Sequence, residues 1–296
     1  MISASIVKEL REKTGCGMMD CKKALTEADG DMEKAIEFLR EKGLAAAVKK
    51  AGRIASEGLV DIIVDGNVGA MVEVNSETDF VAKNEDFKTF VKNVAKQVIK
   101  TNPADVEELL DSKFVDGDAT IKDMLTEKIA TIGENMNVRR FERYEGSIVD
   151  YVHGGGRIGV LVAVEADLAS EEAYEAARDA AMQIAAINPM FLDKDAVPEE
   201  VIIKEKGFIM AQIKEDPKNA KKPENIIEKM VDGKISKFFE QNCLLQQAFV
   251  KDDSISVGKY LESKGVKLLK FARFEKGEGL EKKEDNFAEE VAGMVK

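Results

Sequence analysis

The stretch EGLVDIIVDGNVGAMVEV, residues 57–74, decides the fold. Apolar residues alternate on both sides of the turn Asp65-Gly66-Asn67, and this pattern is typical of a β-hairpin. The pattern returns about 90 residues later in EGSIVDYVHGGGRIGVLVAV, residues 145–164. A stretch with helical periodicity follows each hairpin, from Asn84 in the first case and over about 170–187 in the second. The sequence therefore predicts a duplicated unit in which a helix covers one face of a small sheet.

Other parts of the chain flank this core. Residues 1–42 are predicted to form three short helices, with Asp31 capping the third and Gly43 ending it. Residues 198–242 show two amphipathic helices joined by a short turn that contains proline, which indicates an antiparallel helical hairpin. From residue 267 an alternating run predicts a strand that completes the second sheet. An amphipathic helix with Phe287, Val291 and Met294 on one face is expected at the end.

The predicted fold class is α+β, with a small N-terminal three-helix domain, duplicated hairpin-plus-helix core subdomains, an inserted helical hairpin and a C-terminal helix. We expect the domains to divide as follows: 1–55 N-terminal domain and linker; 56–144 core subdomain one; 145–189 and 243–278 core subdomain two; 190–242 inserted hairpin; 279–296 C-terminal helical module. The length of 296 residues by itself predicts two or three domains of ordinary size, so some of these divisions are small modules.

Composition restricts the function. The formal net charge is −12, and an acidic chain repels phosphate backbones, so direct nucleic-acid binding is not expected. The cysteines Cys16, Cys21 and Cys243 form no CxxC pair and the chain has one histidine, so no zinc site is expected. No apolar run is long enough to span a membrane, and no signal or transit peptide is evident. These features predict a cytoplasmic protein with no cofactor and no metal.

GGGRIG at 154–159 satisfies the G-x-G-x-x-G pattern of dinucleotide-binding proteins. That pattern binds pyrophosphate only where it opens a helix, and here it opens an apolar β-run. A glycine-rich hairpin tip is therefore the preferred interpretation. His153, beside this tip, is interpreted either as a polar residue at a hairpin end or as a protein contact. No catalytic group is predicted, because no nucleophile and base occur together in a recognisable pattern.

The segment NSETDFVAKNEDF, residues 75–87, is the strongest candidate for a functional site. Ser76 or Thr78 is expected to cap a brief helical turn, and Asn84 is expected to start the next helix. This places Phe80 at a tight corner. Two interpretations stay open: Phe80 is a satellite core residue, or it is an exposed aromatic anchor that enters a partner's pocket.

Several segments together resemble the bacterial elongation factor Ts family in order and spacing, from one end of the chain to the other. The segments are VKELREKTGCGMMDCKKALTEADGDMEKAIEFL, NSETDFVAKNEDF, IGENMNVRR, HGGGRIGVLVAV and FARFEKGEGLEKKEDNFAEEVAGM. The N-terminal block and the TDFVA segment are highly specific, whereas HGGGRIG alone is weak. The resemblance implies a ubiquitin-associated-like N-terminal domain and a coiled-coil hairpin, and it leaves open a homodimer through that hairpin.

The resemblance also implies a partner, elongation factor Tu in its GDP-bound and nucleotide-free forms, and residues that contact it. The N-terminal contact matches Met18, Met19, Asp20 and Lys22. The TDFVA turn, Thr78, Asp79, Phe80, Val81 and Ala82, would wedge beside the partner's magnesium and phosphate site and dislodge the magnesium. Ile132 and Gly133 match part of the same interface, and His153 matches a contact with the partner's third domain.

The implied function is guanine nucleotide exchange during translation elongation: the protein binds elongation factor Tu–GDP and promotes GDP release, and it is not an enzyme. The first alternative is an adaptor that binds a partner without exchange activity. The second is an α/β enzyme that uses the GGGRIG segment, which would bind nucleotide by itself.

Overall fold

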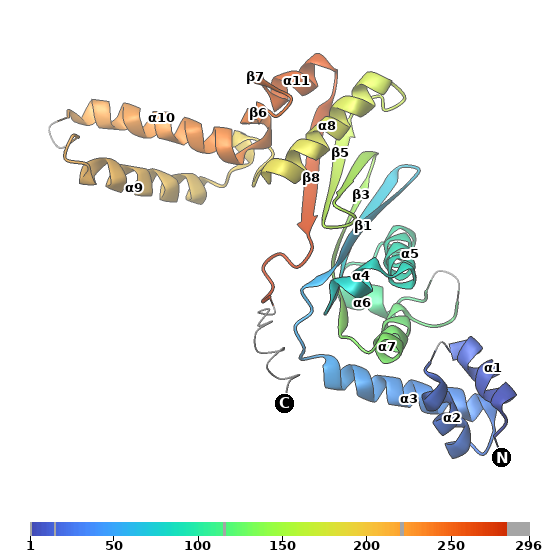
Figure 1. The fold of residues 1–296 in the computed structure, drawn as a ribbon. Helices are drawn as coiled ribbons and strands as arrows, with labels where there is room; N and C mark the ends of the chain where they lie inside the picture. Colours follow the sequence, from blue (N-terminus) through green and yellow to red (C-terminus); the bar gives the residue numbers. More distant parts are fainter. Residues whose placement is uncertain (1, 15, 115–116, 220–221, 283–296) are drawn as a thin grey trace.

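The computed structural model describes residues 2–14, 16–114, 117–219 and 222–282, and over these ranges the protein is a mixed α+β structure with antiparallel sheets. Figure 1 shows an elongated molecule in which the sheets lie between the N-terminal helices at one end and a helical hairpin at the other. The terminal helix expected through Phe287, Val291 and Met294 lies outside the described residues. Within those ranges, no helix has both the length and the apolar character that crossing a membrane requires.

The N-terminal unit consists of three helices: α1 (Ala4–Thr14), α2 (Met18–Glu27) and α3 (Met32–Lys50). They share a small buried core formed by Val7, Leu10, Cys21, Ala24, Leu25, Ala35 and Leu39. Asp31 caps α3 as predicted, because its carboxylate accepts hydrogen bonds from the backbone N–H groups of Glu33 and Lys34 at 3.0 and 3.1 Å.

The prediction that Gly43 ends the third helix is wrong. α3 continues to Lys50, and Gly43 is buried where α3 packs against α7 (Ile121–Ile132). A Cβ added at Gly43 would lie 3.3 Å from the Cβ of Ala130, so the missing side chain lets the two helices approach closely. Helix packing and helix termination both favour glycine, and one sequence does not distinguish them.

The first sheet has the strand order β1-β2-β3, all antiparallel: β1 (Glu57–Asp65), β2 (Val68–Ser76) and β3 (Met136–Glu145). Helix α5 (Glu85–Thr101) covers one face, with Phe87, Phe90, Val91, Val94 and Val98 buried as the sequence predicts. α6 (Val106–Asp111) and α7 extend this core. The short helix α4 (Asp79–Lys83) lies between β2 and α5.

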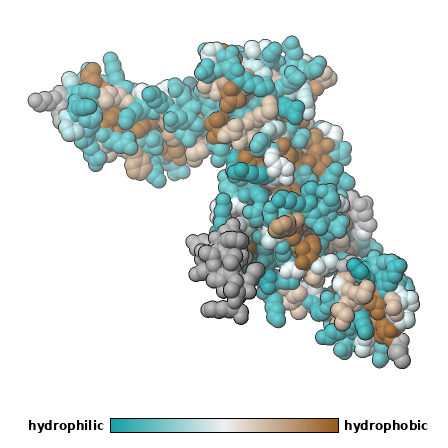
Figure 2. Space-filling model, viewed as in Figure 1, coloured by the Kyte–Doolittle hydropathy of each residue, from teal (hydrophilic) through white to brown (hydrophobic). Residues whose placement is uncertain are grey.

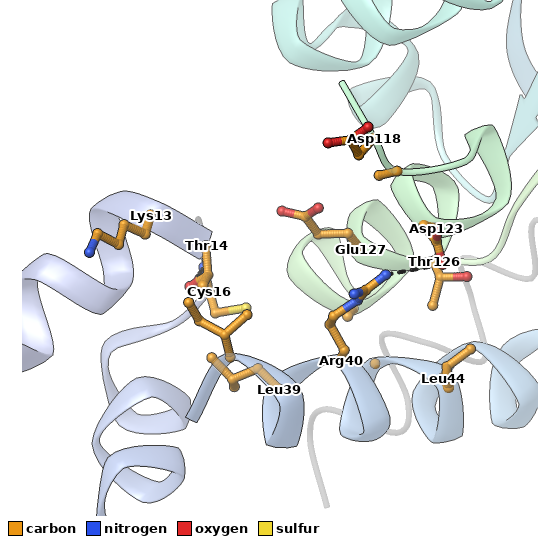
Figure 3. Close-up of a pocket in the computed structure, with 14 residues that line it drawn as sticks. Lys13, Thr14, Cys16, Leu39, Arg40, Leu44, Asp118, Asp123, Thr126 and Glu127 are labelled. Carbon is orange, nitrogen blue, oxygen red and sulfur yellow. Dashed lines mark hydrogen bonds and ion pairs between the residues drawn. The ribbon is translucent and has the colours of Figure 1, made fainter. Parts of the chain in front are cut away.

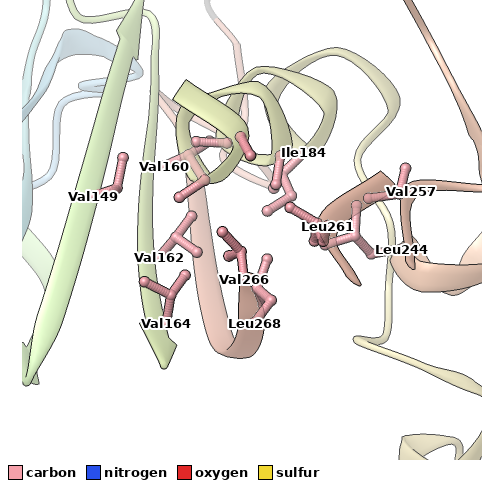
Figure 4. Close-up of a cluster of buried hydrophobic side chains, with 14 of the residues drawn as sticks. Val149, Val160, Val162, Val164, Ile184, Leu244, Val257, Leu261, Val266 and Leu268 are labelled. Carbon is pink, nitrogen blue, oxygen red and sulfur yellow. The ribbon is translucent and has the colours of Figure 1, made fainter. Parts of the chain in front are cut away.

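The second sheet has the order β4-β5-β8: β4 (Ser147–His153), β5 (Ile158–Glu165) and β8 (Lys267–Glu275). Helix α8 (Glu171–Ile187) covers it, and small alanine side chains of α8 allow close contact with Val160, Val162 and Val164. Figure 4 shows this core, to which Leu244, Val257, Leu261, Val266 and Leu268 also contribute. These last residues lie in or beside η2 (Leu244–Gln246), α11 (Val257–Ser263) and β8.

The two sheets pack against each other through the faces that α5 and α8 leave free. The buried residues between them are Val60, Ile62, Met71, Tyr144, Ile148, Leu161, Ala163 and Phe274. Two strand glycines permit the contact. A Cβ at Gly69 would lie 2.6 Å from Cγ2 of Ile148, and a Cβ at Gly159 would lie 2.5 Å from Cγ1 of Val60. The layer order is therefore helix, sheet, sheet, helix.

The details of strand pairing correspond between the sheets. The register shifts once in each, between Glu73 and Val74 where β2 meets β3, and between Ala163 and Val164 where β5 meets β8. Both covering helices end at an asparagine in the left-handed conformation, Asn102 (φ 47°) and Asn188 (φ 53°), and a proline follows each. The connection from strand to covering helix differs, because only the first includes α4.

Strand β3 was not predicted from the sequence. Val74 faces Val138 and Glu73 faces Arg140, so Arg139 is an extra residue that interrupts the alternation of the strand. The flanking residues are mostly charged, which further weakens the apolar signal. The predicted strand near 267 is confirmed as β8, where the corresponding extra residue, Leu269, is exposed.

The helical hairpin consists of α9 (Glu199–Glu215) and α10 (Glu224–Asn242), which pack through Ile209, Ile213, Val231 and Ile235. Figure 1 shows it projecting from the body. Near its base lie the short helix η1 (Lys194–Ala196) and a two-stranded ribbon, β6 (Ala248–Phe249) and β7 (Asp252–Ser256). The space-filling view in Figure 2 shows a mostly hydrophilic surface interrupted by hydrophobic areas on the hairpin, the body and the N-terminal helices.

One buried carboxylate joins the first sheet to the segment after β8. Glu73 is fully buried on β2. Its oxygens accept hydrogen bonds from Arg139 at 3.0 Å, Arg140 at 2.6 Å, Asn75 at 3.1 Å and the backbone N–H of Gly277 at 2.7 Å. Burial raises the pKa of Glu73, but the donors, led by Gly277, outweigh burial and hold its pKa below the ordinary 4.5.

Candidate protein-binding surface

Phe80 is presented to solvent by α4. Its residue surface is 80% exposed, whereas the next residue, Val81, is buried against the core of the first sheet. The interpretation of Phe80 as a core residue is therefore wrong. Val81 anchors the helix and Phe80 faces outward, which is the arrangement that an aromatic binding anchor requires.

The neighbours of Phe80 are charged. Asp79 pairs with Lys83 one turn later at 2.5 Å. Lys83 donates a hydrogen bond to the Asp79 carboxylate and lowers its pKa. Asp79 thus carries a negative charge near neutral pH beside an exposed apolar ring, and Lys83 balances that charge.

The structure brings the TDFVA turn beside the IGEN segment. Thr78 donates hydrogen bonds from its backbone N–H and its hydroxyl to the Glu134 carboxylate, at 3.0 and 2.7 Å. Glu134 follows Ile132 and Gly133 directly, and Gly133 is the left-handed C-cap of α7 (φ 88°). The expectation that Ser76 or Thr78 caps the turn is only half right, because Thr78 occupies the N-cap position of α4 without making a side-chain cap.

His153 lies at the exposed end of β4. The glycine-rich turn that follows it leads into strand β5 and not into a helix. The hydroxyl of Tyr151 lies 3.1 Å from the Nδ1 atom of His153. The backbone N–H of Val60 donates to the carbonyl of Gly156 at 2.8 Å, so the hairpin tip is held at the beginning of β1. The partner of Glu57 in β2 is Ser76, so the tip and α4 lie toward the same end of the first sheet.

The N-terminal candidates form a separate exposed area. Met18 and Met19 are 55% and 74% exposed at the start of α2, although side chains of this type are usually buried. Asp20 forms an ion pair with Lys42 of α3, and Lys22 is exposed. The four predicted residues therefore share one accessible helix start, and flexible methionines suit binding to a protein surface.

A cleft of about 470 Å³ lies where the N-terminal unit meets α7 and the loop before it. Figure 3 shows Thr14, Cys16, Leu39 and Arg40 on one side, and Asp118, Asp123 and Glu127 on the other. The only ion pair across this joint among the residues drawn joins Arg40 and Asp123 at 3.4 Å. Burial raises the pKa of Glu127, which lines the cleft.

Neither buried thiol has the lowered pKa of a reactive cysteine. Burial raises the pKa of Cys21 and raises that of Cys243 to about 11, which keeps both thiols protonated. Over the described ranges, no three His, Cys, Asp or Glu side chains are grouped so as to hold a metal ion.

Sequence reasoning missed Glu77, Glu134 and Asn135, which fix the position of the turn. The backbone N–H of Asn135 donates to Glu77 at 2.6 Å. These contacts join residues more than 50 positions apart, so no local pattern indicates them.

Comparison with known proteins gives a consistent result. The family model described as Elongation factor TS matches residues 77–278. Curated proteins named Elongation factor Ts are similar over nearly the whole chain. That of Clostridium kluyveri is 53% identical over 100% of this chain and 99% of its own length. That of Clostridium perfringens is 55% identical, covering 99% of both chains, and that of Clostridium acetobutylicum is 53% identical, covering 98% and 97%.

Proposed function

This chain belongs to the elongation factor Ts family, and from that premise we propose that it binds elongation factor Tu–GDP and promotes GDP release. The observation that carries the proposal is the outward orientation of Phe80 on a helix anchored by Val81. The exchange requires contact and shape complementarity, since no covalent bond forms or breaks.

The proposed mechanism is mutual weakening of two ligands. If the factor lowers the affinity of its partner for GDP, GDP must lower the affinity for the factor equally. Nanomolar binding of GDP corresponds to about −12 kcal/mol. Accelerating its release by about 10⁴ requires lowering the barrier by about 5.5 kcal/mol. Burying a phenylalanine side chain contributes roughly 1.5–3 kcal/mol, so the wider interface must supply the remainder.

The residues divide into two proposed roles. The turn from Thr78 to Ala82, with Phe80 at its exposed point, would wedge beside the partner's phosphate site and displace its magnesium. Ile132 and Gly133 would support the same contact, and Met18, Met19, Asp20, Lys22 and His153 would hold the partner elsewhere. The exposed positions of Phe80, Met18, Met19 and His153 support this division.

Finer features of the fold are proposed with the function. The three N-terminal helices would form a ubiquitin-associated-like domain, and the matching register shifts and Asn-Pro helix ends support an internal duplication of the core. The α9–α10 pair would correspond to a coiled-coil insertion that supports a homodimer.

The proposal is tested by following labelled GDP as it leaves elongation factor Tu. We expect the wild-type protein to accelerate release, and Phe80→Ala to reduce the maximal rate by about tenfold or more, because the lost burial corresponds to roughly 1.5–3 kcal/mol. Phe208→Ala is the matched control, since Phe208 is also an exposed phenylalanine (57%) but lies on the projecting helix α9.

Binding of the wild type without accelerated release would instead support an adaptor. A Phe80→Ala variant as active as the wild type would remove Phe80 from the mechanism. Circular dichroism should show both variants folded, because neither side chain is buried.

A further inference from the structure

Two pairs of neighbouring residues, Glu77-Thr78 and Glu134-Asn135, hold each other in place. The Glu134 carboxylate accepts both hydrogen bonds that Thr78 donates, at 3.0 Å from the backbone N–H and 2.7 Å from the hydroxyl. In return, the Glu77 carboxylate accepts the backbone N–H of Asn135 at 2.6 Å. Each carboxylate therefore binds the backbone of the other pair, and we refer to these four residues as the reciprocal clamp.

The helix that carries Phe80 depends on this clamp. α4 has five residues, and a helix this short is not stable alone in water. Its N-cap residue, Thr78, makes no side-chain cap, and its hydroxyl donates to Glu134. The Ser76 hydroxyl donates to the carbonyl of Thr78 at 3.0 Å, so that carbonyl is held from the strand side. The orientation of α4 is thus set by contacts with the rest of the protein, through its own buried Val81 and through the bonds from Thr78 to Glu134.

The clamp also reaches the chain that leads out of the N-terminal unit. The side-chain amide of Asn135, which is nearly fully buried, donates to the carbonyl of Arg53 at 2.8 Å. Arg53 pairs with Glu77 at 3.4 Å. The turn, the end of α7 and the linker after α3 therefore meet at one point.

We infer that Glu134 is a positioning residue for nucleotide exchange: it fixes the orientation in which α4 presents Phe80, and it does so through Thr78. This inference rests on the proposed function. Hydrogen bonds to a charged carboxylate are shorter and stronger than those between neutral groups, so two of them restrict the turn firmly. Without them, α4 samples several orientations, and the apparent affinity for the partner falls with the fraction that is competent to bind.

The test measures GDP release from elongation factor Tu over a range of factor concentrations. We expect Glu134→Ala to raise the half-saturating concentration by about tenfold. The maximal rate should stay within about twofold, because at saturating factor concentration every partner molecule is bound by the competent orientation. Glu134→Gln keeps one acceptor oxygen and should fall between the wild type and Glu134→Ala. In a Phe80→Ala background, Glu134→Ala should change the half-saturating concentration little, since the residue acts through the presented ring.

A second measurement does not depend on the partner. Amide hydrogen exchange of residues 77–84 should become faster in Glu134→Ala, whereas the amides of α5 should stay protected. The matched control is Glu145→Ala, which removes a carboxylate at the other end of β3, paired with Arg143 at 2.6 Å and remote from Thr78.

Failure of the wild type to release GDP would end the proposed function, and the amide measurement would still decide whether Glu134 orders the turn. The inference is overturned if Glu134→Ala matches the wild type in GDP release, or if its effect persists in full without Phe80. Unchanged amide exchange of residues 77–84 would also overturn it. If Glu134→Ala loses protection in α5, the same comparisons apply to Glu134→Gln.

Discussion

Glu73 shows how much a single buried carboxylate can contribute to this fold. It accepts hydrogen bonds from two arginines and from Gly277, and these contacts join β2, β3 and the segment after β8. Removing the carboxylate leaves the partly buried arginines and the Gly277 N–H without their charged acceptor. The residue therefore links the first sheet to the chain that follows the last strand of the second sheet.

We expect Glu73→Gln to lower the free energy of unfolding at pH 7 by about 3 kcal/mol, as is usual when a buried ion pair loses one partner. The folded-state pKa of Glu73 lies below 4.5, so its contribution is present above that pH and is lost as the pH falls through the folded-state value. Urea unfolding measures the free energy of unfolding of the variant and the wild type at pH 7 and below pH 4.5. The difference between the two proteins should be smaller at the acid pH.

Glu165→Gln is the control for this measurement, because Glu165 is exposed and pairs with Lys267 at the surface. Its effect should stay below about 1 kcal/mol at every pH. An equal difference between Glu73→Gln and the wild type at pH 7 and in acid would contradict the assignment of a depressed pKa to Glu73.

The candidate site was predicted only in part at this scale. The sequence identified the corner at Phe80 but left two orientations open, because the side that a five-residue helix exposes depends on tertiary contacts. Those contacts come from Val81 beneath the helix and from Glu134, 56 residues further along the chain. Whether these residues bind a partner stays a prediction.

At the scale of elements, the packing of the two sheets against each other depends on glycines within strands. We expect Gly159→Ala to lower the free energy of unfolding by about 1–3 kcal/mol, because its Cβ would lie 2.5 Å from Val60 and 3.1 Å from the Met71 sulfur. Adding Val60→Ala should recover part of the loss by making room. Thermal or urea unfolding measures both variants.

Gly207→Ala in α9 is the contrasting substitution, since its added Cβ would meet nothing within 4 Å beyond its chain neighbours and its own helix backbone. It should leave stability unchanged or raise it by up to about 1 kcal/mol, because alanine favours the helix. Stability of Gly159→Ala equal to that of the wild type would mean that the sheets can separate to accept a side chain.

The elements themselves were predicted where local signals are strong. Both β-hairpins, the covering helices and the α9–α10 pair follow from alternation, turn residues and helical periodicity. Strand β3 was missed because Arg139 interrupts the alternation of apolar and polar residues. The end of α3 was wrongly predicted at Gly43, which is a glycine because α3 packs closely against Ala130. In both cases the residue type is explained by a contact with a distant part of the chain, which local sequence patterns do not reveal.

At the scale of the whole molecule, the proposed contacts have two roles. The N-terminal helices would bind the partner, and the turn that carries Phe80 would open its nucleotide site. We expect the double variant Met18→Ala, Met19→Ala to raise the half-saturating concentration for GDP release at least fivefold, because two exposed apolar anchors are lost. The maximal rate should stay close to wild type, since Phe80 is unchanged. Concentration series of the release assay separate the two quantities.

The control for this variant is Val48→Ala, an exposed apolar residue of α3 outside the predicted contact. A lower maximal rate with an unchanged half-saturating concentration would show that the N-terminal helices act on the nucleotide site itself. The predicted boundary between the N-terminal domain and the core stays a prediction.

The helix α4 is absent from the second sheet, although the strand registers and the covering helices correspond in the two halves. The second half of the core thus folds without such a segment, and within α4 only Val81 is buried against the core, so the other four residues are less constrained by folding. We therefore expect substitutions at the exposed α4 positions to change the proposed contact with the partner while the core folds as before. For evolution, as for an engineer seeking weaker or stronger versions, the residues of α4 other than Val81 offer adjustable positions on a fixed core.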